Sequence, residues 1–201
     1  MGPAGGAGVS AIAVGDLHSC AVHNGAVKCW GAGGVGQLGT GASIFSSAVP
    51  VQVAGLTANA TDVTTGKFQS CAIVSGAAFC WGQGDSGEMG NGTNTYVNLA
   101  PVAVSGYGSG VSVLSSGAYF NCGIQNAAAK CWGFGAQGRL GGGNTNLSNV
   151  PQQVSGLTSG VTAISAGNGL HGCGVQGGGA LCWGANNAGQ LGNPGATGGS
   201  N

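Results

Sequence analysis

The sequence predicts an all-β, propeller-like fold made of four stacked sheet modules. One signature recurs four times at an interval of 51 residues: a cysteine, a second cysteine nine residues on, Trp-Gly, then Gly-x-[Leu/Met]-Gly. Strand-like segments flank every copy, and all eight cysteines and four tryptophans obey the period. Such periodicity means that one structural unit is stacked along the chain.

The repeat also predicts the domain organisation. Residues 1–8 form a Gly-rich N-terminal arm, residues 9–193 a single four-repeat domain, and residues 194–201 a Gly-rich C-terminal tail. Within the domain, the repeats span approximately 9–59, 60–110, 111–160 and 161–193. Although the chain holds 46 Gly, its 42% hydrophobic content and strict period favour a packed structure over disorder.

Each repeat opens with a β-branched segment that ends in glycine. These segments alternate as half-buried strands do. They cover residues 9–15, 61–66, 111–117 and 161–167.

A hairpin follows each opening segment. In the first copy, Asn24-Gly25 is the dipeptide that a two-residue type I′ turn prefers, and a turn there places Cys20 opposite Cys29. Counting from the turn, this rung is a close, non-hydrogen-bonded one with Cα atoms about 4.5 Å apart, which lies within disulfide range. The other copies carry Ser75-Gly76, Asn126-Ala127 and Gly177-Gly178 at the turn.

The eight cysteines are therefore expected to form four cross-strand disulfides. Zinc sites usually bring closely spaced Cys-x2-4-Cys pairs, which this chain lacks, and free core thiols are the remaining alternative. Disulfides would place the protein in an oxidising compartment. The expected pairs are Cys20 with Cys29, Cys71 with Cys80, Cys122 with Cys131 and Cys173 with Cys182.

A fourth strand is expected between repeats, opened by a proline at residues 50, 101 and 151. Proline is tolerated at the first residue of an edge strand. Four strands per repeat is the plan of a propeller blade, here a four-stranded antiparallel sheet. Since this strand occurs only three times, one blade should be a strand short, and its open edge would invite a second chain.

The tryptophans follow a strand cysteine and should point to the opposite sheet face. Packing between blades is the expected role, and an exposed sugar-stacking platform is the alternative. The four residues are Trp30, Trp81, Trp132 and Trp183.

Charge is scarce, with four basic and four acidic side chains and a net charge of zero. A basic stripe is missing, so nucleic acid is not expected as a partner. Membrane insertion is not expected either, because no apolar run reaches about 18 residues. Low net charge removes repulsion between copies and favours self-association. The first eight residues have neither a basic start nor a hydrophobic stretch, so no signal peptide is expected in this chain.

Candidate chemical groups are few. His18, His23 and His171 are expected to pack or donate hydrogen bonds, and Asp85 with Glu88 suggests at most a weak calcium contact in a solvated loop. No catalytic, metal or cofactor site is predicted, and a small-molecule ligand is not expected. Three sequons match the N-glycosylation pattern, which matters only where the source glycosylates; they begin at Asn59, Asn91 and Asn146.

The run from His18 through Cys20, Cys29-Trp30-Gly31 and Gly36-Gln37-Leu38-Gly39 to Pro50-Val51-Gln52-Val53 resembles the regulator of chromosome condensation repeat, in its extracellular, cysteine-containing form. Kelch repeats have a similar period but a different Gly-Gly and Tyr/Trp spacing. The resemblance implies a propeller blade, in a family whose members look like seven-bladed rings. They include a nuclear exchange factor for a small GTPase and a secreted β-lactamase inhibitor. Four repeats leave a compact ring, an open arc, or several chains together.

These observations favour a secreted or cell-surface, non-enzymatic scaffold whose main protein partner is a copy of itself. The alternative is a secreted protein-binding or inhibitor module that uses the loops of one propeller face. A glycan lyase or hydrolase would need a polar cluster that the repeats do not show.

Overall fold

The computed structural model describes residues 8–167 and 169–193, and these form four antiparallel sheets arranged as successive propeller blades. The first sheet holds β1 (Val9–Val14), β2 (His18–His23), β3 (Ala26–Ala32) and β4 (Ser46–Gln52). The second holds β5 (Ala60–Thr65), β6 (Gln69–Val74), β7 (Ala77–Gln83) and β8 (Val97–Ala103). The third holds β9 (Val111–Ser116), β10 (Phe120–Gln125), β11 (Ala128–Gly133) and β12 (Ser148–Gln153), with the 3-10 turn η1 (Ala136–Gly138) before β12. The fourth holds β13 (Val161–Ala166), β14 (His171–Gln176) and β15 (Gly179–Gly184).

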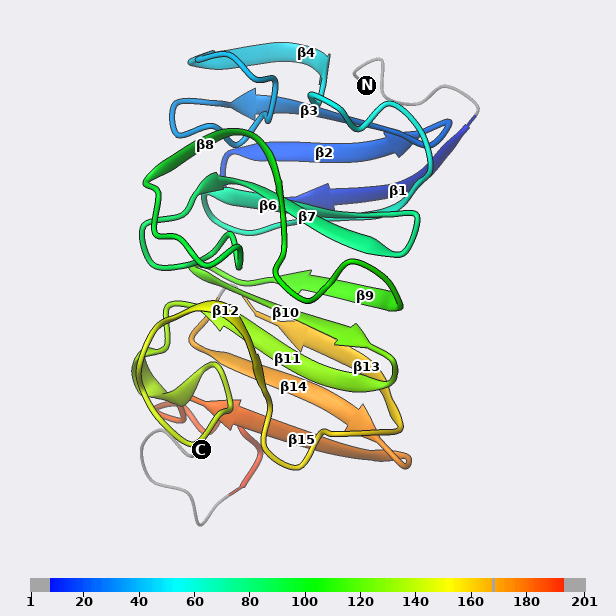
Figure 1. The fold of residues 1–201 in the computed structure, drawn as a ribbon. Helices are drawn as coiled ribbons and strands as arrows, with labels where there is room; N and C mark the ends of the chain where they lie inside the picture. Colours follow the sequence, from blue (N-terminus) through cyan, green and yellow to red (C-terminus); the bar gives the residue numbers. More distant parts are fainter. Residues whose placement is uncertain (1–7, 168, 194–201) are drawn as a thin grey trace.

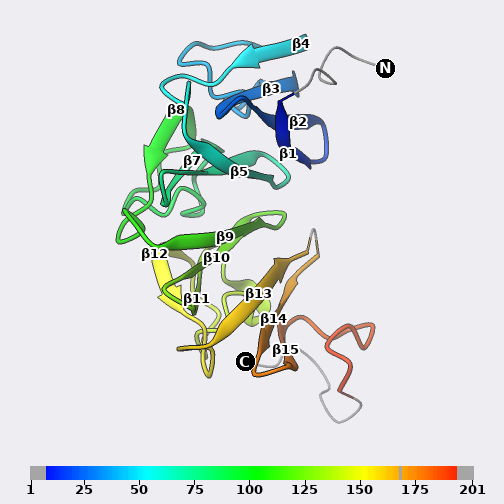
Figure 2. The ribbon, with the colours of Figure 1, turned by 90° about the vertical axis from the view of Figure 1, so that its right-hand side faces the viewer.

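The sheets follow one another along an open arc rather than a closed four-bladed ring. Figure 1 shows the first sheet at one end of the stack and the fourth at the other, and Figure 2 shows the curvature. The first strands of successive sheets lie against each other, β1 on β5, β5 on β9 and β9 on β13. The predicted all-β fold is confirmed, as is the shorter last sheet, which has three strands within residues 161–193.

The hairpin register is the one that the turns predicted. His23 pairs with Ala26 and Cys20 with Cys29, and both Asn24 and Gly25 have positive φ, as a type I′ turn requires. Disulfides join all four predicted cysteine pairs, with Cα atoms 4.0 to 4.1 Å apart. Each bridge therefore joins the two strands of the hairpin within one blade.

The outer strands differ from the prediction that proline opens them. β4 begins at Ser46, and Pro50 lies inside the strand, within a stretch where the pairing jumps from Cys29–Val51 to Gly31–Ser47. A bulge leaves residues out of the ladder, so the missing N–H of proline costs no hydrogen bond there. The same irregularity recurs in β12 and its pairing to β11.

Three hydrophobic clusters form the core of the described residues, and each lies between two successive blades. The cluster between the first two blades joins the Cys20–Cys29 disulfide and Leu38 with Val63 and Trp81. Because the cores lie between blades, every blade depends on its neighbours for burial. The ranges predicted for the terminal arm and tail, 1–8 and 194–201, lie outside the described residues except for Gly8.

None of the described residues forms a helix long and apolar enough to cross a membrane.

Candidate functional site

Successive blades contact each other at the Gly-x-[Leu/Met]-Gly loop, which binds the tryptophan side chain of the next blade. We call this loop, with the carbonyl that accepts the indole N–H, the seat of that tryptophan. The indole Nε1 of Trp81 donates to the carbonyl oxygen of Gln37 at 2.8 Å. Trp132 donates to Glu88 at 2.9 Å, and Trp183 to Arg139 at 2.8 Å. The same bond therefore joins each blade to the one before it. A buried indole N–H needs such a partner, so the bond fixes the spacing of the blades.

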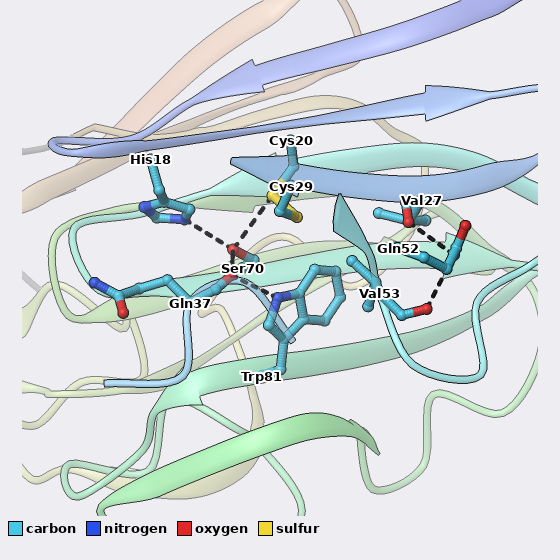
Figure 3. The surroundings of a disulfide bond; sticks show 9 residues. All are labelled: His18, Cys20, Val27, Cys29, Gln37, Gln52, Val53, Ser70 and Trp81. Carbon is cyan, nitrogen blue, oxygen red and sulfur yellow. Dashed lines mark hydrogen bonds between the residues drawn. A yellow bond between two sulfur atoms is a disulfide. The ribbon is translucent and has the colours of Figure 1, made fainter. Parts of the chain in front are cut away.

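In two of the three contacts, the same carbonyl accepts a second donor from the residue that precedes the first cysteine of the next blade; in the fourth blade this residue is Gly172, which has no side-chain donor. Ser70 Oγ donates to Gln37 at 3.2 Å, and Asn121 Nδ2 donates to Glu88 at 2.7 Å. Figure 3 shows Ser70 and Trp81 converging on Gln37, with His18 and the Cys20–Cys29 disulfide beside them. This donor was not predicted from the sequence, because the position before the first cysteine holds different residue types in the four repeats: Ser19, Ser70, Asn121 and Gly172.

The last glycine of the loop leaves room for the indole ring of the next blade. Gly39 has φ +64°, and a Cβ placed there would lie 2.7 Å from the Trp81 ring. Gly90 meets Trp132 in the same way. These loops are thus tight turns between blades, and any side chain at the last glycine would displace the indole ring.

Apolar side chains from the first strand complete the contact. Val63, Leu114 and Ile164 occupy the same position in successive blades, and each is at most 8% exposed against the disulfide-containing face of the preceding blade. Burying such a side chain stabilises the fold by about 1.5–3 kcal/mol.

The first blade exposes this half of the contact. We call the head face the residues Val9, Ile12, Val14 and Trp30. Ile12 is 64% exposed and Val14 is 75% exposed, whereas their counterparts in the later blades are buried. Trp30 is half-buried, unlike the other three tryptophans, and within the described residues no other blade packs against it.

The fourth blade exposes the opposite half. We call the tail face the Cys173–Cys182 disulfide, Val175, Ala180 and the loop from Gly189 to Gly192. The first three disulfides are fully buried, but Cys173 and Cys182 are half-buried. A shallow, apolar pocket of about 150 Å³ lies over Cys173, Val175 and Ala180. Gly192 is the last glycine of its loop, equivalent to Gly39 and Gly90, which contact a tryptophan ring. A Cβ built at Gly192 would have no atom within 4 Å, so this side of the loop is uncovered by the described residues.

Three buried titratable groups lie at or beside the seats. His18 donates to or accepts from Ser70 Oγ at 2.8 Å, and burial lowers its pKa to about 4 despite the opposing charge of Asp16. Burial raises the pKa of Glu88 to about 7 and lowers that of Arg139. Glu88 and Arg139 occupy the x position of their loops, where the first blade has Gln37. The side chains of all three groups form hydrogen bonds with loop and blade atoms.

We expect Glu88→Gln to stabilise the protein in alkaline solution. Glu88 Oε2 accepts from the Ser86 N–H while Oε1 is buried without a partner, and Gln37 makes the equivalent bond as a neutral amide. A raised pKa means that stability is complete below pH 4.5 and declines as pH rises through 7. The variant should gain roughly 3 kcal/mol at pH 8 and close to nothing at pH 4.5. Urea unfolding of the wild type and the variant from pH 4.5 to 8 measures the difference in their free energies of unfolding. His18 is present in both proteins, so its own pH dependence cancels from this difference.

A second candidate contact is formed by a basic and two aromatic side chains from two blades. The Lys67 Nζ lies 5.3 Å from the ring centres of both Phe68 and Tyr119. These residues come from the loops after β5 and β9, and all three are half-buried. Their arrangement is a cation–π cluster that a protein loop could contact.

The remaining predicted residues lie apart from each other. His23 is beside a hairpin turn, and His171 is half-buried on the fourth blade. Asp85 accepts from Gln83 in its loop. The described residues contain no group of three or more His, Cys, Asp or Glu side chains placed to hold a metal. Asn59 and Asn146 are exposed, and the side chain of Asn91 accepts from Thr93 within its own sequon.

Comparison with known proteins finds parts of this chain similar to one repeat family. The family model of the regulator of chromosome condensation (RCC1) repeat matches residues 24–73 and 131–173. The human E3 ubiquitin-protein ligase HERC2 is 32% identical over 128 residues, which are 62% of this chain but only 3% of that protein.

Two solved structures are similar over nearly the whole chain. Human WBSCR16 has a TM-score of 0.80 and 28% identity over 93% of this chain and 50% of its own. Yeast RCC1 (Prp20), crystallised with Kap60, has a TM-score of 0.82 and 17% identity over 96% of this chain and 48% of its own. The chain thus spans about half the length of these structures.

Proposed function

The chain is a β-propeller built from RCC1-like repeats, and we propose that it serves as a secreted, non-enzymatic scaffold whose arcs self-associate. One observation carries the proposal: the core of this fold lies between blades, and the arc exposes half of such a core at each end. Exposed apolar patches of this kind mark protein interaction sites.

The scarcity of charge supports association between copies. With four basic and four acidic residues in 201, net charge provides little repulsion between two arcs. Nor do the head and tail faces contain a charged side chain that would oppose their burial.

The four disulfides support an exported setting. Three of the four are fully buried. A disulfide in every blade is typical of proteins that fold in an oxidising compartment. For the non-enzymatic role, the support is that His18, Glu88 and Arg139 contact blade and loop atoms. HERC2 carries the name of a ligase, but this chain matches 3% of it, and the likeness gives a fold rather than a reaction.

The oligomeric state tests this proposal. We expect sedimentation velocity, over a series from about 1 to several hundred μM in non-reducing buffer, to show concentration-dependent association of the 19.0 kDa chain. Because the driving force is apolar burial, association should persist in about 1 M NaCl, where charge contacts are screened. A single monomeric species at all concentrations would contradict the scaffold role.

That contradicting result would favour the alternative role, a protein-binding module that uses the Lys67, Phe68 and Tyr119 cluster. Yeast RCC1 (Prp20), a protein with a similar fold, was crystallised bound to another protein, Kap60. The uncovered ends, however, present more apolar surface than this cluster, so we place self-association first.

A further inference from the structure

We propose that the head face of one copy docks onto the tail face of a second copy, in the register of one further blade. This inference rests on the proposed self-association and names the surfaces that perform it. The two faces are the two halves of a contact that the chain already makes three times, at Trp81, Trp132 and Trp183. A contact between unlike faces is heterologous, so it produces rings or filaments.

The loop on the tail face already has the conformation that binds a tryptophan in the other blades. Gly192 N–H donates to the Gly189 carbonyl at 3.0 Å, as Gly39 N–H does to Gly36 at 2.9 Å. Gln190 Oε1 accepts from the Ala188 N–H at 2.9 Å, which repeats the bond between Gln37 and Val35. A preformed site loses little entropy when its partner binds.

The head face carries the donors that this seat lacks. In the internal contacts, the carbonyl of Gln37 receives the Trp81 indole and the Ser70 hydroxyl. Trp30 and Ser19 are the same residue types at the same positions of the first blade. Docked in register, they would supply both donors to the Gln190 carbonyl of the second copy.

A backbone bond extends the match. The Ala166 N–H donates to Ser115 Oγ at 2.8 Å and the Ser116 N–H to Thr64 Oγ1 at 3.0 Å, in each case between successive first strands. Ser165 is the hydroxyl residue at this position of the last blade. Val14 is the residue of the first blade equivalent to Ser116 and Ala166, so its N–H in a second copy would donate to Ser165 Oγ.

The apolar groups are also complementary. Ile12 occupies the position of Val63, which packs in the cluster containing the Cys20–Cys29 disulfide and Val22. On the tail face the equivalent disulfide and Val175 line the pocket of about 150 Å³. An isoleucine side chain entering it would cover the half-buried Cys173.

Two single variants break the contact from opposite sides. Ile12→Asp places a carboxylate on the head face, and Ala180→Asp places one in the tail pocket; both residues are exposed, so the fold should tolerate either change. We expect each variant alone to sediment as a monomer at concentrations where the wild type associates. Val49→Asp is the matched control, since Val49 is an exposed aliphatic residue on the outer strand β4 and should change nothing.

Mixing the two variants is the decisive experiment. The Ala180→Asp chain keeps its head face and the Ile12→Asp chain keeps its tail face, so one intact contact can form. A mixture at equal concentration should produce a species of two 19.0 kDa chains, one of each variant, and nothing larger. Thermal melts of each variant check that folding is unchanged.

The outcomes separate this inference from the proposed function. A wild type that stays monomeric overturns both. Association that survives Ile12→Asp and Ala180→Asp leaves the scaffold role standing and overturns the head-to-tail contact. Monomeric variants that fail to pair on mixing also overturn it, because contacts between like faces would not be restored by the exchange.

Discussion

Trp132→Ala is expected to be among the most destabilising single substitutions in this chain. Trp132 is fully buried, donates to the Glu88 carbonyl at 2.9 Å and packs edge-on to Tyr107 at 5.4 Å between ring centres. Removing it opens a cavity in the cluster between the second and third blades, at a cost of about 3–5 kcal/mol. Guanidinium unfolding at pH 7 should report this loss as a lower midpoint.

Trp30→Ala is the matched control, because it removes the same residue type from the same position of the first blade, where Trp30 is half-buried and no other described blade packs against it. At concentrations where the chain is monomeric, its cost should stay below about 1 kcal/mol. Trp132→Phe should cost about 1–2 kcal/mol, since a smaller aromatic ring fills most of the space while the hydrogen bond is lost. Equal losses for the Trp30 and Trp132 variants would show that blade contacts do not carry the stability.

Mild reduction of the folded protein is expected to open one disulfide first, Cys173–Cys182. Its cysteines are half-buried, whereas the other six are fully buried, and thiol–disulfide exchange needs access to a sulfur atom. Native treatment with dithiothreitol, followed by iodoacetamide and peptide mass mapping, should find Cys173 and Cys182 alkylated at least about tenfold faster than the rest. In denaturant the four bridges should react at similar rates.

Full reduction should have a much larger effect. Each bridge closes a short loop and contributes about 2.5 kcal/mol or less, so four together rival the 5–15 kcal/mol of an ordinary domain. We expect the fully reduced chain to fail to refold, as measured by far-UV circular dichroism after removal of denaturant. A reduced chain that regains its strands would show that blade packing alone is sufficient.

The sequence predicted the local structure of each blade well, because it depends on residues close in the chain. The turn at Asn24-Gly25 sets the register of β2 and β3, and that register alone places Cys20 opposite Cys29. The outer strand was less predictable. Proline at position 50 suggested a strand start, but the bulge opposite the first hairpin tolerates it inside β4, and a bulge has no simple sequence signal.

The sequence by itself determined four equivalent, disulfide-linked blades and a missing fourth strand in the last one. Only the tertiary structure decided that they form an open arc, that Trp81 and Trp132 reach loop carbonyls of the preceding blade, and that Ile12 and Ala180 remain uncovered. The reason is physical. Turn and register are fixed within about ten residues, whereas burial in a repeat protein depends on a neighbour about fifty residues away. Among the described residues, no blade packs against the outer faces of the first and fourth blades.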